Sequence, residues 1–186
     1  TTATAGTPYY YWVAATNAGG SAESASNSGY KRLTAPANVA ATDGSSTANV
    51  AVTWDAATGA SAYHVWRDTD SDPAGATALG AQSSGFTDAP TPGQIYYYWV
   101  VASNATSSST SDWSTANSGY RKLPAVAGVA ATENLSDKVT VTWTDSDAGE
   151  TGYTVWRSDD SDSGNAAIIS GAALGANAVT YDDATA

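Results

Sequence analysis

The chain has 186 residues and a formal net charge of −11, with 18 acidic against 7 basic side chains. Because a protein this acidic cannot neutralise the phosphates of a nucleic acid, no nucleic-acid partner is expected. It has no Cys, which excludes disulfides and thiolate metal sites. Without Met, it is expected to be a mature or excised segment. No apolar run is long enough to span a membrane.

Sequence blocks recur along the chain about 90 residues apart. In chain order, Tyr9–Val13 returns as Tyr96–Val100, Asn27–Tyr30 as Asn117–Tyr120, Val39–Thr42 as Val129–Thr132, Val52–Trp54 as Val141–Trp143, and Tyr63–Arg67 as Tyr153–Arg157. Each block alternates with a period of two between turn-forming residues, which predicts short strands. About seven strands per repeat favour an antiparallel sandwich.

The blocks resemble the fibronectin type III family over essentially the whole chain. The inward Trp of the family's second strand is matched by Trp54 and Trp143, the Tyr-x-Val of its third strand by Tyr63/Val65 and Tyr153/Val155, and its sixth-strand motif by Tyr9–Asn17 and Tyr96–Asn104. The resemblance implies an all-β chain of tandem immunoglobulin-like sandwiches. It also implies that Tyr9 and Tyr96 are tyrosine corners, whose hydroxyls bond nearby backbone. The Cys-free, acidic composition is similar to bacterial or archaeal extracellular members.

The phase of the repeats predicts three segments. Residues 1–33 are the last two strands of a module, residues 34–123 a complete module, and residues 124–186 the first five strands of another. An isolated hairpin is marginal in water, and a five-stranded remnant exposes its core. We therefore expect residues 1–33 of one copy to complete residues 124–186 of another. Two routes stay open: one continuous chain, which we favour, or strand exchange between subunits.

Two acidic clusters follow the predicted third strands. They consist of Asp68, Asp70 and Asp72, and of Asp159, Asp160 and Asp162. Close carboxylates are ligands that Ca²⁺ takes, but neither cluster has the glycine and glutamate of an EF-hand loop. We expect solvated acidic turns, with Ca²⁺ as the weaker alternative, and no other cofactor or metal.

Outward-facing aromatic residues are the candidate interaction surface. By the period of two, Trp66, Tyr97 and Trp99 share one exposed face, as do Trp156 and the next copy's Tyr10 and Trp12. Trp113 is an additional contact candidate or an isolated surface residue. Such residues mark a protein contact or stack across strands, and a sugar platform is the less favoured reading. The sequons at Asn104 and Asn134 are possible glycosylation sites.

Catalysis is not expected, because the single His64 has Thr154 as its repeat counterpart and no nucleophile and orienting carboxylate accompany it. The sequence indicates a structural repeat unit of an extracellular filament, stalk or adhesin, assembled head to tail from its own copies. A surface glycan or cell-surface molecule is a possible further partner. The alternative is a spacer or carbohydrate-binding accessory module of a secreted polysaccharide-degrading enzyme.

Overall fold

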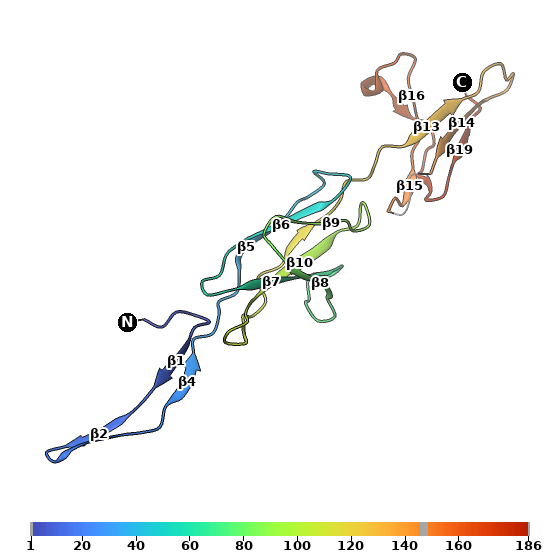
Figure 1. Ribbon diagram of the computed structural model, residues 1–186. Coiled ribbons are helices and arrows are strands. Elements are labelled where there is room, and N and C mark those ends of the chain that lie inside the picture. Colours follow the sequence, from blue (N-terminus) through green and yellow to red (C-terminus); the bar gives the residue numbers. More distant parts are fainter. Residues whose placement is uncertain (1, 146–148, 186) are drawn as a thin grey trace. The chain divides into compact units, whose positions relative to one another are not determined.

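A computed structural model describes residues 2–145 and 149–185, and apart from one short 3₁₀ helix every regular element in this part of the chain is a β-strand (Figure 1). The chain divides into two compact units. Unit 1 comprises the residues up to Pro90 together with Ile95–Arg121, and unit 2 comprises Thr91–Gln94 and the residues from Lys122 onward. The break lies slightly before the predicted one at residue 123, because Leu123 packs beside Gly93 and Gly149 of unit 2.

The central part of unit 1 is a complete two-sheet sandwich. One sheet has the order β5-β6-β9, formed by Ala37–Ala41, Val50–Asp55 and Phe86–Asp88. The other has the order β11-β10-β7-β8, with β12 also paired to β10; these strands are Ser109–Thr110, Tyr96–Asn104, Ala62–Asp68, Thr77–Gln82 and Asn117–Gly119. The predicted fold class, tandem immunoglobulin-like sandwiches, is confirmed.

The core of this sandwich follows from the alternation in its strands. Val50, Val52 and Trp54 of β6 are buried, whereas the intervening residues are not. They pack against Val65 of β7 and against Tyr98 and Val100 of β10. The predicted inward positions of the valines and of Trp54 are therefore confirmed, and Tyr63 is half-buried at the edge of the cluster.

The N-terminal segment is a long hairpin (Figure 1). It pairs β1 (Pro8–Tyr11) with β4 (Asn27–Tyr30) and β2 (Ala14–Asn17) with β3 (Gly20–Glu23). Only its base is buried, where Ala5 and Leu33 pack with Ala102. The rest of the hairpin contributes no side chain to a core cluster.

Unit 2 repeats the first half of the sandwich. The sheet β13-β14-β19, formed by Ala127–Ala131, Val139–Thr144 and Thr180–Asp183, matches β5-β6-β9. Two short pairs correspond to β7 and β8: β15 (Gly152–Tyr153) with β18 (Leu174–Gly175), and β16 (Trp156–Arg157) with β17 (Ala167–Ile168). A one-turn 3₁₀ helix, η1, covers Ser163–Asn165. The described residues of unit 2 include no strand equivalent to β10, β11 or β12.

Strand β5 of unit 1 and its repeat counterpart β13 of unit 2 share an irregularity. Both β5 and β13 shift register against their neighbours, between Ala37 and Ala40 and between Ala127 and Ala130. The bulged position is left-handed in both, with φ of 52° at Asn38 and 65° at Gly128. Asn and Gly are the residues that adopt this conformation most readily, so the repeat preserves the bulge with two different side chains.

Candidate functional site

Strand β10 closes the core of unit 1. Tyr98, Val100 and Ala102 point inward from it and are fully buried. The strand lies antiparallel to β7, with Tyr98 opposite Arg67 and Val100 opposite Val65. Without β10, the inner faces of both sheets would therefore lose their cover.

A polar triad is built into this closed core. The Tyr98 hydroxyl donates to Asp88 Oδ2 at 3.0 Å, and Arg67 Nη1 binds the same oxygen at 2.6 Å. Burial raises the pKa of Tyr98 well above its usual value, and the negative charge of Asp88 raises it further. Arg67 also lies over the Tyr96 ring, 4.7 Å from its centre. The charges are thus paired where they are shielded from solvent.

Unit 2 has the same inner residues but an open face. Val129 is 65% exposed, whereas its repeat counterpart Val39 packs on the core of unit 1. Val141, counterpart of the fully buried Val52, is only half-buried. The repeat block that buries Val52 in unit 1 therefore leaves Val141 only half-buried in unit 2. The missing cover explains the difference.

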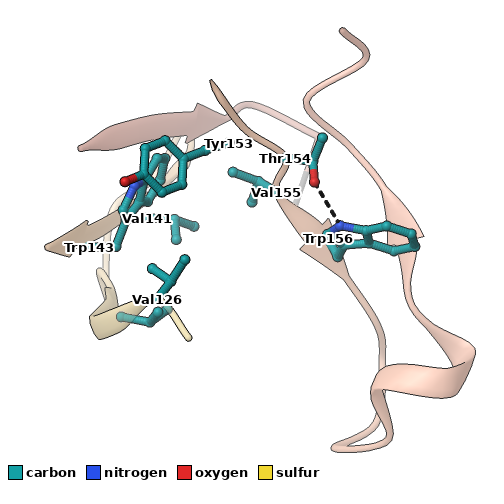
Figure 2. A pocket seen from close by; sticks show the side chains of 8 residues that line it. Val126, Val141, Trp143, Tyr153, Thr154, Val155 and Trp156 are labelled. Carbon is teal, nitrogen blue, oxygen red and sulfur yellow. Dashed lines mark hydrogen bonds between the residues drawn. The ribbon is translucent and has the colours of Figure 1, made fainter. Parts of the chain in front are cut away.

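The open face forms an apolar groove of about 180 Å³. It is lined by Val126, Val129, Val141, Trp143, Tyr153, Thr154, Val155 and Trp156, and Figure 2 shows seven of these labelled. Trp143, Tyr153 and Val155 form the small core beneath it. The Trp156 indole is held to one side by a 3.1 Å bond to Thr154 Oγ1 (Figure 2).

An ion pair lies beside the groove. Arg157 Nη1 binds Asp183 Oδ2 at 2.6 Å, and the Asp183 side chain is buried. Hydrogen bonds from the hydroxyl and backbone N–H of Thr185, helped by Arg157, hold the pKa of Asp183 below its usual range. Asp183 opposes Val139 as Asp88 opposes Val50. Unit 2 therefore repeats the Arg–Asp part of the triad in unit 1.

The N-terminal hairpin presents the residues that correspond to β10. Tyr11 and Val13, counterparts of Tyr98 and Val100, are 57% and 74% exposed. The pairing of β1 with β4 places Tyr11 opposite Asn27, as β10 and β12 place Tyr98 opposite Asn117. The hairpin thus has the register of the closing strands with its apolar face uncovered.

A serine contact fixes the bend of this hairpin. Ser24 N–H donates to Val13 O at 2.9 Å, and Val13 N–H donates to Ser24 Oγ at 3.1 Å. Ser114 and Val100 make the same two bonds in unit 1, at 3.1 and 3.0 Å. The hairpin backbone is therefore already shaped like the closing strands of a sandwich.

The predicted tyrosine corners are found in one repeat only. The Tyr9 hydroxyl accepts from the Thr4 N–H at 3.0 Å. Hydrogen bonding with the side chain and then the backbone of Thr4 lowers the pKa of Tyr9. In the other repeat, the hydroxyl that makes a hydrogen bond is that of Tyr98, which donates to the Asp88 carboxylate. The ring of Tyr96 lies beneath Arg67. The prediction of a tyrosine corner at Tyr96 is therefore wrong. The Asp88 carboxylate of β9 binds the more deeply buried hydroxyl of Tyr98.

The outward aromatic residues of unit 1 pack on one another. Trp99 is only 2% exposed, so its predicted exposure is wrong. It lies opposite Trp66, and Trp113 stands edge-on to both rings, at 5.1 Å from Trp66 and 6.4 Å from Trp99. Tyr97 is half-buried beside Trp99. The rings of this group therefore stack on one another across the strands.

The second aromatic group lies where exposure was expected. Tyr10, Trp12 and Trp156 are all exposed. Glu23 takes the place that Trp113 has in the repeat of unit 1. No ring therefore covers Trp12 in the hairpin as Trp113 covers Trp99.

The acidic clusters form self-bonded turns. Asp70 and Asp160 each accept from the backbone N–H two residues on, at Asp72 (2.9 Å) and Asp162 (2.7 Å). These bonds lower the pKa of Asp160. Asp68 is half-buried, and the other five acids are exposed. Across the described residues no group of three or more His, Cys, Asp or Glu is arranged to hold a metal ion.

We expect a chelator to leave the unfolding temperature of the chain unchanged. Backbone donors already occupy these carboxylates, so no folding energy is linked to a cation. Thermal unfolding with excess EDTA, and then with millimolar Ca²⁺, measures this. A transition that rises steadily with free Ca²⁺ would show that the turns bind it.

The two sequon asparagines differ in accessibility. Asn104 Nδ2 donates to Gly59 O at 2.5 Å, and its Oδ1 accepts from two backbone N–H groups. A sugar on Asn104 would replace one of the two Nδ2 hydrogens, so only the remaining N–H could donate to Gly59 O. Asn134 is exposed, with a left-handed backbone (φ 64°).

The Arg–Asp pairs were not among the predicted site residues. A signal for them exists, because Trp-Arg ends the third strand of each module, at Arg67 and Arg157, and an Asp ends the fifth, at Asp88 and Asp183. Only the strand pairing brings each Arg onto its Asp.

No family model matches the chain, and no curated protein matches it. Among solved structures, the crystal structure of chicken CNTN1 FN1–FN3 domains is similar to 98% of this chain and to 67% of that chain, at 15% identity and a TM-score of 0.40. The assignment of the sandwich fold rests on the strand order and core of unit 1. No helix within the described residues is long and apolar enough to cross a bilayer.

Proposed function

We propose that the chain is a structural repeat unit of an extracellular filament, stalk or adhesin, in which copies join head to tail. Its N-terminal hairpin occupies the open face of unit 2 in the preceding copy. The shared core is a third sandwich, built from two copies. The chain acts by holding shape and spacing rather than by catalysis.

One observation carries this proposal: the chain leaves two apolar faces uncovered whose repeat counterparts pack together in unit 1. Val129 and Val141 lie open in unit 2, and Tyr11 and Val13 lie open in the hairpin. In unit 1 their counterparts bury one another. Large uncovered apolar faces on a folded protein mark contact surfaces.

A contact of this kind builds an open assembly and not a closed ring. The hairpin and the groove are different surfaces, so each copy offers one of each, and a heterologous contact of this kind builds a filament. Residues 89–95 connect β9 to β10 in unit 1, and the sequence after Asp183 and before Tyr9 is longer. A continuous chain can therefore make the same pairing as separate subunits.

Each unit contains the same close backbone contact at a glycine. In unit 1, Gly59 lies so close to the Ala5 carbonyl that a Cβ would fall 1.9 Å from it, and Leu33 lies alongside. In unit 2, Gly149 has the same relation to Pro92, with Leu123 alongside. The repeat therefore preserves the same local packing within each unit.

Assembly of the purified chain tests the proposal. Because the net charge of −11 makes copies repel at low salt, the buffer needs about 0.15 M salt. We expect mass that grows with concentration in sedimentation, and unbranched filaments by electron microscopy. A tandem of two copies should also gain one stable sandwich over two separate chains. A chain that stays monomeric, together with a tandem that gains nothing, would contradict the proposal.

A further inference from the structure

We propose that Arg157 and Asp183 are the receiving half of a polar triad, which the Tyr11 hydroxyl of a second copy completes. The inference rests on the proposed head-to-tail assembly and specifies what sets its register. Tyr11 would donate to Asp183 as Tyr98 donates to Asp88 in unit 1. The triad makes Tyr11 a specificity-determining residue of the contact.

The acceptor is already in place in unit 2. Asp183 Oδ1 takes the N–H of Thr185 at 2.9 Å and its hydroxyl at 2.7 Å, whereas Oδ2 takes Arg157 at 2.6 Å. A carboxylate oxygen accepts two hydrogen bonds. In unit 1 the corresponding oxygen, Asp88 Oδ2, accepts both Arg67 and Tyr98.

The arginine of unit 2 also lacks the cover that its counterpart has. The side chain of Arg157 is 44% exposed, against 23% for Arg67. Arg67 is shielded by the Tyr96 ring, whose repeat counterpart is Tyr9. Docking of the hairpin would therefore bring one ring over the guanidinium and one hydroxyl onto the carboxylate.

The repeat fixes the register that this requires. Tyr98 lies opposite Arg67, Trp99 opposite Trp66 and Val100 opposite Val65. The counterparts place Tyr11 opposite Arg157, Trp12 opposite Trp156 and Val13 opposite Val155. A slip of one residue would turn Tyr11 to the outer face and bury Trp12 in its place.

Hydrogen bonds to a charged group discriminate more than apolar contact does. A slipped hairpin would still bury aromatic surface, but it would leave Asp183 with an unfilled acceptor position in a closed core. Leaving such a position unfilled is costly when water is excluded. The triad therefore rejects the wrong register, while the valines and aromatic rings supply most of the attraction.

The full-length variant Tyr11→Phe tests this, with Tyr10→Phe as its matched control on the outer face of the same strand. We expect Tyr11→Phe to raise the concentration needed for assembly about tenfold or more. Tyr10→Phe should leave it within about twofold. The double variant Tyr11→Phe/Asp183→Asn should assemble no worse than the weaker of its two single variants, because Tyr11→Phe removes the hydroxyl and Asp183→Asn removes the charge that the hydroxyl would bind.

Equal effects of the two phenylalanine variants, or additive effects in the double variant, would overturn the inference while leaving head-to-tail assembly intact. Failure of the wild-type chain to associate would instead overturn the proposed function, and the triad with it. Thermal unfolding of each variant confirms that the isolated chain is folded. Since Tyr11 is 57% exposed there, Tyr11→Phe should leave that transition unchanged.

Discussion

The substitution Val13→Asp should weaken the affinity between copies of the chain at least about a thousandfold, because it places a carboxylate in an apolar core. The counterpart of Val13 in unit 1, Val100, is fully buried between the two sheets. A charge there has no partner and no water. Sedimentation of the full chain at rising concentration measures the loss.

The free chain should tolerate this change, since Val13 is 74% exposed in it. Thr16→Asp is the matched control, because it adds the same charge to the same hairpin on the outer face. The repeat counterpart of Thr16 is Ser103, which β10 turns away from the core. If Thr16→Asp weakens association as much as Val13→Asp does, charge repulsion and not core burial explains the result.

Replacing Trp54 by alanine destabilises unit 1 by roughly 3–5 kcal/mol, the usual cost of removing a buried tryptophan. Trp54 is buried among the valines of both sheets, and its ring lies 5.7 Å from that of Tyr63. Because a domain of this size has about 5–15 kcal/mol of stability in total, the loss removes a large share of it. Urea unfolding followed by circular dichroism measures the shift.

The variant Trp113→Ala is the control for Trp54→Ala, because it removes an equal ring from the outer face and not from the inner core. Trp113 covers Trp66 and Trp99 on the outer face and is 38% exposed. We expect its replacement to cost less than about 2 kcal/mol. Equal costs for the two variants would mean that the outer aromatic cluster is as important as the inner core.

The repeats made the strands and the inner core predictable. A period of two places Val50, Val52 and Trp54 on one face, and two-sheet packing then requires that face to be buried. The same blocks at Val139 and Trp143 predict the same strand in unit 2. Local sequence determines these features, because each strand carries its own pattern.

Features that depend on neighbouring strands were not predictable in this way. The period of two correctly turned Trp99 outward, but it could not show that Trp113, from the segment between β11 and β12, would cover it. Similarly, the resemblance predicted a hydroxyl bond for Tyr96 and none for Tyr98. The position of Asp88 on the opposite sheet selects Tyr98, and no pattern within one strand carries that information.

Disulfide trapping between two copies tests the central claim most directly. The chain has no Cys, so engineered thiols have no competitors. Val101 lies opposite His64 in unit 1, and the counterparts of this pair are Ala14 and Thr154. Facing residues of antiparallel strands have Cα atoms about 4.5–5.5 Å apart, within the range a disulfide spans.

Chains carrying only Ala14→Cys are mixed with chains carrying only Thr154→Cys and oxidised, so that any mixed product joins two copies. The control mixes Ala14→Cys with Ser158→Cys, which the proposed register places four residues, or roughly 13 Å, out of line. We predict a dominant mixed dimer for the first pair and little for the control. Equal yields from the two mixtures, or none from either, would contradict the pairing of the hairpin with unit 2.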